Sequence, residues 1–283
     1  MATFTNQATL RYNGNVVNSN ITTGELLEVL SATKTAVIDS YSQGSDITYV
    51  INIVNSGTIT FTGISITDNL GAYTFGVNTY VPLDYVTGST RYYLNGVLQA
   101  TPVVLDGPPL VISGITVPAN GVATIIYVAR ANQYAPLNLD GTITNTAAIN
   151  GGGVTEITVT ETVTAESGAR LTISKSICPT TVTENGRLTY TFVIQNIGNQ
   201  PAVATDNVSI TDTFNPILTG LNVAYNDVIW TEGINYTYSE TTGEFATISG
   251  EITVPAATYT QDPTTGEWIV EPGIGVLTVT GTV

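Results

Sequence analysis

The sequence predicts an all-β protein of two tandem immunoglobulin-like antiparallel sandwiches, preceded by an N-terminal hairpin. Three observations support this prediction. Apolar and polar residues alternate over short segments, which is the period of a half-buried strand. Asn-Gly, Ser-Gly and Pro-Ala turns separate these segments. A sequence repeat also divides the 283 residues into two comparable halves, each of a size suited to one sandwich.

The repeat begins at a lysine and runs through strand after strand. The lysine, tyrosine, asparagine and glycine of the first two segments keep one constant offset between the copies. A Ser-Ile-Thr-Asp segment and a Thr-Val-Pro-Ala turn follow in each copy. The matching segments are, in chain order, 31–37 with 172–178, 47–57 with 188–198, 64–68 with 208–212, and 112–119 with 248–256.

These residues resemble a known family. The pattern Lys-Thr, Thr-Tyr-x-Ile-x-Ile-x-Asn-x-Gly, Ile-x-Ile-x-Asp and Thr-Asn-x-Ala is similar to the bacterial surface repeat family known as DUF11, and it covers nearly the whole chain twice. The duplicated arrangement and the size resemble the main structural proteins of ribbon-like appendages on bacterial spores. The resemblance implies a homopolymer on a spore or cell surface, with other appendage or coat proteins as further partners.

The second copy lacks the last strands of the first. In the first copy, residues 141–151 and 154–163 follow the apolar strand at 122–128, whereas the sequence stops at Val283, just after the counterpart of that strand. The missing segments have matches at the N-terminus, where 4–14 resembles 143–151 and 16–22 matches 154–160. We therefore expect three parts: a donor hairpin over 1–24, a first sandwich over 25–165, and a second sandwich over 166–283 without its last strands.

A sandwich that lacks a strand exposes unpaired backbone groups, and an isolated hairpin has nothing to pack on. If the hairpin fills the second sandwich of its own chain, the molecule is closed. If it fills the second sandwich of the next molecule, the contact does not close on itself, and repetition gives a fibre. We favour the fibre, because the hairpin leads into the first sandwich whereas the gap lies in the second. A natural strand beyond Val283 is the third possibility.

Lys34 and Lys175 are the only lysines, and they occupy the same position of the repeat. Because side chains alternate between the two faces of a strand, each lysine shares its face with apolar or alanine neighbours. The same rule turns carboxylate and amide side chains toward the core at four further positions: Asp68, Asp212, Asn145 and Asn6.

Isolated buried charges are costly, so we expect these groups to meet. One chemistry that uses them is spontaneous isopeptide formation. A desolvated lysine has a lowered pKa and becomes an amine nucleophile, while a buried aspartic acid stays protonated and polarises the asparagine carbonyl. The alternatives are a buried Lys–Asp salt bridge with the asparagine as a hydrogen-bond partner, or no meeting at all. By resemblance, sandwich domains of bacterial pilins and adhesins form such bonds from a lysine, an asparagine and an acidic residue.

The expected cross-links differ between the sandwiches. The first would join Lys34 to Asn145 within one chain, with Asp68 as the promoting acid. The second would join Lys175 to Asn6 of another chain, with Asp212 in the same role. Each is a single-turnover self-modification, so the sequence does not predict an enzyme.

Cys178 is the only cysteine, and parity along its strand places it outward. It is either a small strand residue or one half of an interchain disulfide. A single cysteine, the absence of histidine and the lack of an Asp-x-Asp-x-Asp loop predict no metal site and no cofactor.

The charge balance narrows the partners. With 7 Lys+Arg against 22 Asp+Glu, the net charge is −15, which repels nucleic acid and anionic lipid. No apolar signal or membrane segment is visible, so we expect another export route, a removed leader, or assembly inside a cell before release. The alternative function is a surface adhesin module that binds glycan or host protein through its loops.

Overall fold

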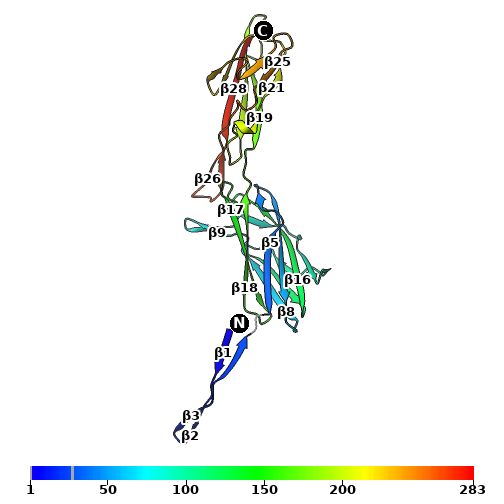
Figure 1. The fold of residues 1–283 in the computed structure, drawn as a ribbon, viewed down its shortest axis with the longest axis vertical. Coiled ribbons are helices and arrows are strands. Elements are labelled where there is room, and N and C mark those ends of the chain that lie inside the picture. Colours follow the sequence, from blue (N-terminus) through cyan, green and yellow to red (C-terminus); the bar gives the residue numbers. More distant parts are fainter. Residues whose placement is uncertain (1, 27–28) are drawn as a thin grey trace. The chain divides into compact units, whose positions relative to one another are not determined.

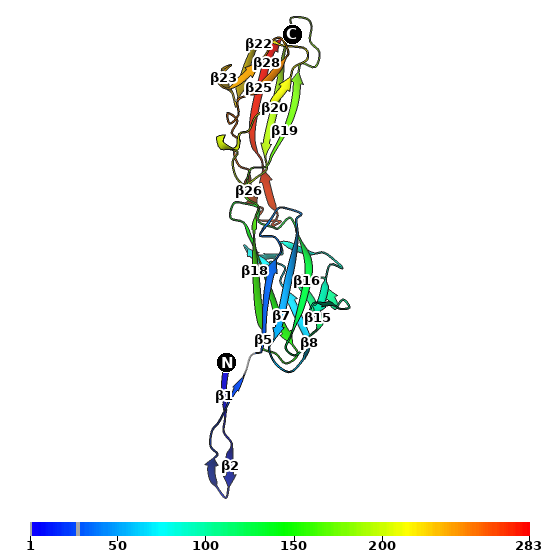
Figure 2. The same cartoon turned by 45° about the vertical axis from the view of Figure 1, so that its right-hand side comes forward.

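The computed structural model describes residues 2–26 and 29–283, and it confirms an all-β fold of immunoglobulin-like sandwiches. The chain divides into two compact units, whose strands Figures 1 and 2 show from two sides. Unit 1 comprises residues up to Thr74, Thr79–Asn132 and Ile143–Val163, and unit 2 comprises Phe75–Asn78, Gln133–Thr142 and Thr164–Val283.

Unit 1 is built from two six-stranded sheets. The first has the order β13 (Val97–Leu98), β12 (Arg91–Leu94), β16 (Gly121–Ala131), β7 (Asp46–Asn55), β5 (Leu30–Ala36), with β11 (Leu83–Tyr85) also paired to β16. The second has the order β14 (Val103–Leu105), β15 (Leu110–Val117), β8 (Phe61–Asp68), β17 (Thr142–Gly151), β18 (Ile157–Ala165), β6 (Ser40–Tyr41). A short ribbon joins β9 (Tyr73–Phe75) to β10 (Asn78–Tyr80).

Alternation along the central strands forms the core of unit 1. Every second residue of β7 and β16 is buried, and the antiparallel register sets Tyr49 opposite Tyr127. Burial of each large apolar side chain stabilises the fold by roughly 1.5–3 kcal/mol. The inward residues of the two strands are Ile47, Tyr49, Ile51, Ile53, Ala123, Ile125, Tyr127 and Ala129.

Unit 2 has one full sheet and one short sheet. The full sheet has the order β19 (Leu171–Cys178), β20 (Arg187–Asn196), β28 (Gly273–Thr282), β22 (Thr219–Tyr225), β23 (Val228–Trp230). The short sheet contains only β21 (Thr211–Thr213), β25 (Glu244–Thr247) and β24 (Tyr236–Tyr238). The remaining elements are the ribbon of β26 (Thr258–Gln261) with β27 (Trp268–Glu271) and a 3-10 helix over Ala204–Asp206.

The short sheet of unit 2 has an open edge where the corresponding sheet of unit 1 is paired. In unit 1, Asp68 at the end of β8 has Leu110 opposite it on one side and Ala147 on the other. In unit 2, Asp212 on β21 has Phe245 opposite it, and β21 is the outermost strand of its sheet in the described residues. The strand missing beside β21 is therefore the counterpart of β17.

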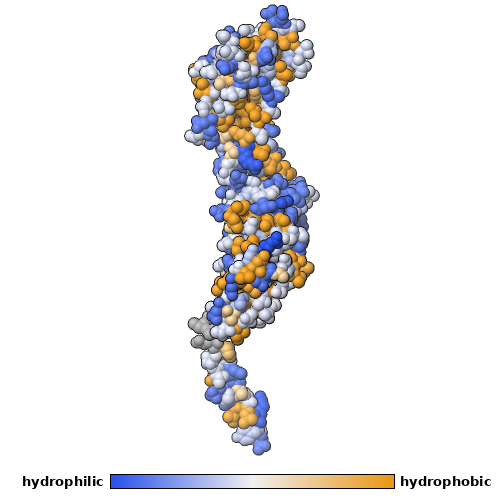
Figure 3. All heavy atoms as spheres, turned by 90° about the vertical axis from the view of Figure 1, so that its right-hand side faces the viewer, coloured by the Kyte–Doolittle hydropathy of each residue, from blue (hydrophilic) through white to orange (hydrophobic). Residues whose placement is uncertain are grey.

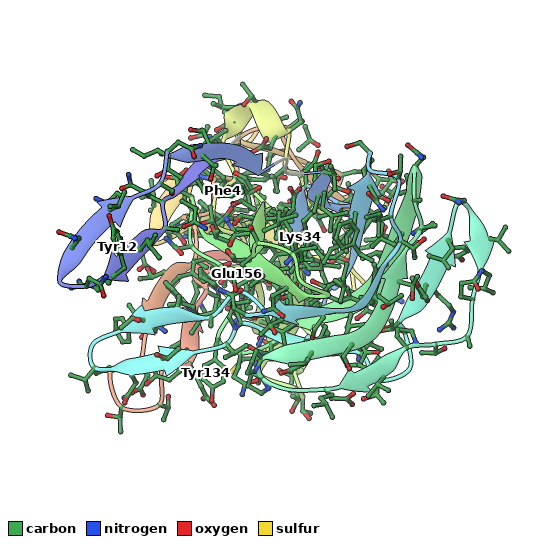
Figure 4. All side chains as sticks on the ribbon, turned by 90° about the horizontal axis from the view of Figure 1, so that it is seen from below. Phe4, Tyr12, Lys34, Tyr134 and Glu156 are labelled. Carbon is green, nitrogen blue, oxygen red and sulfur yellow. The ribbon has the colours of Figure 1, made fainter. Side chains whose placement is uncertain are left out.

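The N-terminal segment is a long hairpin. Strand β1 (Ala2–Asn6) pairs with β4 (Thr22–Leu26), and β2 (Thr9–Tyr12) pairs with β3 (Asn15–Asn18). The turn at Asn13-Gly14 has positive φ at both residues, as a two-residue hairpin turn requires. Residues 4–23 are all exposed, and among the described residues these strands pair only with one another. Figure 4 shows Phe4 and Tyr12 on this ribbon, and Figure 3 shows apolar patches on its surface.

Candidate functional site

The lysine, aspartate and asparagine of unit 1 meet in its core. The Lys34 Nζ atom lies 2.7 Å from Oδ2 of Asp68, and neither side chain has any exposed surface. The hydroxyl of Tyr127 donates to the same Oδ2 atom at 2.5 Å. Nδ2 of Asn145 in turn donates to the Tyr127 hydroxyl at 3.1 Å. Figure 4 shows Lys34 among the packed side chains.

Strand geometry explains why these side chains converge. Lys34 is the buried residue of the edge strand β5, whereas Asp68 closes the inward face of β8. Asn145 lies on β17, two residues before the Ala147 that stands opposite Asp68. Because residues two apart share a face of a strand, the carboxylate and the amide both point into the core. The backbone N–H of Leu70 holds the second carboxylate oxygen of Asp68 at 2.9 Å.

Burial sets the protonation of this cluster. Loss of solvent lowers the pKa of Lys34 to about 8, against the opposing effect of the Asp68 carboxylate. Burial, followed by the charge of Asp68, raises the pKa of Tyr127 well above its ordinary value. The lysine therefore loses its proton unusually easily, and the tyrosine hydroxyl keeps its own.

The amide carbonyl of Asn145 has no hydrogen bond. Oδ1 of Asn145 is buried and makes no hydrogen bond, and the buried hydroxyl of Tyr49 lies near the same amide group. A buried polar atom without a partner costs about 1–3 kcal/mol, so such atoms are scarce in folded proteins.

The equivalent pair in unit 2 is partly exposed. Lys175 contacts Asp212 Oδ2, but its side chain is 38% exposed and that of Asp212 is 19% exposed. The Lys175 ammonium also lies 4.3 Å from the centre of the Tyr190 ring, with Phe192 and Phe214 slightly farther away. Such ring faces attract the charged form of an amine. Both lysines were expected to face the core; in the described residues of one chain Lys34 is buried and Lys175 is not.

Lys175 is exposed because the face of β19 that carries it is not covered by a second sheet in the described part of the chain. All residues of β19 after Leu171 are exposed, among them Ile173 and Ile177 on the lysine's own face. Parity placed these side chains correctly on one face, but no strand of the short sheet covers that face in the described residues. An open hollow of about 550 Å³ adjoins Asp212, and its lining residues are Thr211, Asp212, Thr213, Thr237, Glu244, Phe245 and Ala246.

Two other predicted site residues lie on the surface. Asn6 ends β1, and its side chain is exposed. Cys178 ends β19, is exposed as expected, and has a free thiol. A disulfide between chains stays a prediction.

Sequence reasoning missed Tyr127. It occupies the same alternating face of β16 as Ile125 and Ala129, so its position in the strand predicts only a core side chain. The available signal was a tyrosine in the centre of that strand, because a fully buried hydroxyl needs a partner. Its counterpart in unit 2 is Val279, which stands opposite Tyr190 as Tyr127 stands opposite Tyr49.

Removal of the two aspartates is expected to have unequal effects. In an Asn145→Ala background, where Lys34 keeps a free ammonium, Asp68→Ala should lower the free energy of unfolding of unit 1 by about 3–5 kcal/mol, because a buried charge loses its partner. Asp212→Ala should change that of unit 2 by less than about 1 kcal/mol, because its ion pair is solvated. Denaturant unfolding of both variants checks this, and equal losses would contradict the assigned burial.

No cluster of three or more Cys, Asp or Glu side chains that could hold a metal ion occurs within residues 2–26 and 29–283. Over the same residues, no helix is long and apolar enough to cross a bilayer.

No protein-family model matches the sequence, and a search of curated proteins finds no similar sequence. Solved structures with a similar arrangement include the pilus backbone RrgB of Streptococcus pneumoniae (12% identity, TM-score 0.35, 86% of this chain and 55% of that one). Two others are the major pilin subunit BcpA of Bacillus cereus (10%, 0.35, 95% and 73%) and the collagen-binding subdomain of Enterococcus faecalis ACE (11%, 0.31, 50% and 99%). The chain thus spans about half the length of the RrgB structure.

Proposed function

We propose that the protein is a structural subunit that polymerises head to tail, with the N-terminal hairpin of one copy inserted into unit 2 of the next. One observation supports this most directly. Unit 2 leaves β19 uncovered and the edge of β21 open. In unit 1 the corresponding places are filled by β17 and β18, and the exposed hairpin is a strand pair that matches these two strands in sequence. The two surfaces are complementary. Because the contact joins one patch of a molecule to a different patch of the next, it can repeat from molecule to molecule and build a filament.

The hairpin matches β17 at the inward-facing positions 143, 145, 147 and 149. Ile143 and Ile149 of β17 are buried, and they correspond to Phe4 and Leu10, which are 59% and 63% exposed. These are large apolar side chains held on a preformed strand without a core. Their burial in a second molecule would contribute roughly 1.5–3 kcal/mol each.

The return strands also agree. Hydroxyl bonds join Thr144 to Thr162 across β17 and β18, and the hairpin sets Thr5 opposite Thr23. The offset from Thr5 to Thr144 equals the offset from Thr23 to Thr162, and both equal the offset from Asn6 to Asn145. This register is one residue away from the sequence match of 16–22 with 154–160.

The register of unit 1 predicts the docked arrangement. Ala147 stands opposite Asp68, so Ala8 of the donor should stand opposite Asp212. Asn6 then occupies the place that Asn145 holds beside the buried pair, next to Lys175. The hairpin would also cover Ile173 and desolvate the lysine.

The chemistry that we propose at both sites is isopeptide formation, with Asp68 and Asp212 as the promoting acids. In unit 1, the low pKa of Lys34 and the unpartnered carbonyl of Asn145 support it. Packing of the amine against the amide replaces a bimolecular encounter, which is worth about 7–11 kcal/mol of barrier when alignment is good. In unit 2, the same bond would join Lys175 to Asn6 of the neighbouring copy and make the fibre covalent.

Insertion into a second copy is favoured over insertion into the same chain. Strand β4 ends at Leu26 and β5 of unit 1 begins at Leu30, so a short connection ties the hairpin to unit 1 rather than to unit 2. A surface appendage of a cell or spore is the setting that the DUF11 resemblance implies for such a fibre.

A charge placed in the uncovered face of unit 2 tests the proposal. Ile173→Asp should leave the monomer folded, because this side chain is already 57% exposed, and should block fibre formation seen by electron microscopy. Val228→Asp on β23 is the matched control, since that residue is equally solvated and lies outside the acceptor face. Fibres formed equally by both variants would contradict insertion at β19. Folded monomers of the unmodified protein would instead favour an adhesin.

A further inference from the structure

One hydroxyl connects the acid and the amide nitrogen in unit 1. Tyr127 is fully buried on β16, and its ring stacks on that of Tyr49 with 5.4 Å between ring centres. Its hydroxyl donates to Oδ2 of Asp68 and accepts from Nδ2 of Asn145. The same Oδ2 atom accepts from Nζ of Lys34. A continuous hydrogen-bonded path therefore runs from the amine to the amide nitrogen that departs.

We propose that Tyr127 is a catalytic residue of the Lys34–Asn145 cross-link and that its hydroxyl delivers the proton to the leaving nitrogen. The inference rests on the proposed isopeptide chemistry. Amide nitrogen leaves as ammonia only when it is protonated, since the unprotonated anion is far too basic. The Tyr127 hydroxyl accepts a hydrogen bond from Nδ2 at 3.1 Å and also contacts the acid, which the neighbouring Tyr49 hydroxyl does not. The asparagine carbonyl oxygen makes no such contact.

The steps balance as follows. Nζ of Lys34 passes a proton to Oδ2 of Asp68, and the resulting amine attacks Cγ of Asn145. As the Cγ–Nδ2 bond breaks, Asp68 gives its proton to the tyrosine oxygen while the tyrosine hydroxyl proton moves to Nδ2. Asp68 then takes a second proton from Nζ. Lysine nitrogen thus loses two hydrogens, of which one leaves with ammonia and one remains on Asp68.

Unit 2 provides an internal reference. Val279 occupies the position of Tyr127, so this unit has no hydroxyl there. A change at Tyr127 should therefore slow the bond of unit 1 without affecting a bond between Lys175 and Asn6. The Tyr127 hydroxyl is specific to the intrachain site.

The test is Tyr127→Phe in the full chain, compared with Tyr92→Phe. Tyr92 is a buried tyrosine of the same unit whose hydroxyl donates to the backbone carbonyl of Thr116, so its loss controls for general destabilisation. Pulse-labelled protein is digested at intervals, and mass spectrometry follows the loss of about 17 Da in the peptide that joins residues 34 and 145. Tyr127→Phe should slow this loss at least about 100-fold, as removal of a proton donor does. Tyr92→Phe should match the unmodified protein.

Equal rates for Tyr127→Phe and the unmodified protein would overturn the role of Tyr127 while leaving the cross-link in place. No mass loss in the unmodified protein would overturn the cross-link as well. If Tyr127→Phe does not fold, a ring-fluorinated tyrosine at residue 127 keeps the shape and lowers the phenol pKa. A rate that changes with that pKa supports proton delivery, and an unchanged rate contradicts it.

Discussion

Deletion of residues 1–24 is expected to abolish fibre formation and to leave both sandwiches folded. The strands of this segment pair only with one another among the described residues, so neither sandwich loses a strand. No molecule in the solution then carries a hairpin that could bind the acceptor face of unit 2. Electron microscopy should show no fibres, and analytical ultracentrifugation should find monomers. The circular dichroism spectrum should keep its β-sheet shape. Fibres formed by the shortened chain would show that the hairpin is not the donor.

A synthetic peptide of residues 1–24 supplies the matching control. Added in excess to the shortened chain, it should occupy the open edge of β21 and raise the unfolding temperature of unit 2. Added to the full-length protein, it should shorten fibres because it blocks acceptor ends. The same peptide with Phe4 and Leu10 replaced by serine should have neither effect, since both apolar contacts are lost.

Asn145→Ala is expected to cause the largest loss of stability. With the cross-link, the mass of unit 1 is lower by about 17 Da for the ammonia released, and the variant should keep the full mass. A bond between residues 34 and 145 closes a long loop, and a cross-link of that span stabilises by about 4–5 kcal/mol in the chain-entropy treatment. Denaturant and thermal unfolding should therefore show a marked decrease.

Thr144→Ala is the matched control for this variant. Thr144 is the exposed neighbour of Asn145 on β17, so its replacement tests the strand without touching the buried cluster. It should retain the mass loss and nearly all of the stability. A full-mass unmodified protein that is as stable as Asn145→Ala would identify the site as a salt bridge and not as a bond.

Much of the fold followed from alternation and the repeat. Period-two patterning predicted the strands, and the shared offset of lysine, tyrosine, asparagine and glycine predicted two similar sandwiches. The same parity placed Lys34 and Asp68 on facing surfaces, and they form an ion pair. These inferences succeeded because they depend on local geometry, which one strand determines by itself.

The exposure of Lys175 could not be predicted in this way. Parity states which face a side chain takes, but burial depends on whether a second sheet covers that face. The sheet that faces β19 in unit 2 has three strands in the described residues, whereas the corresponding sheet of unit 1 has six, so Ile173 and Lys175 stay solvated. The partners of Tyr127 could not be predicted for a related reason: a tyrosine within an apolar strand indicates that its hydroxyl needs a partner, but Asp68 and Asn145 come from two other strands.

The most direct measurement uses two chains that cannot cross-link alone. One lacks residues 1–24 and keeps Lys175 as acceptor; the other keeps Asn6 as donor and bears Lys175→Ala. After mixing, denaturing electrophoresis and peptide mass spectrometry should reveal a covalent pair joined through Asn6 and Lys175, absent from either chain by itself. Two folded chains that yield no joined product would contradict a covalent bond between the hairpin of one molecule and unit 2 of another.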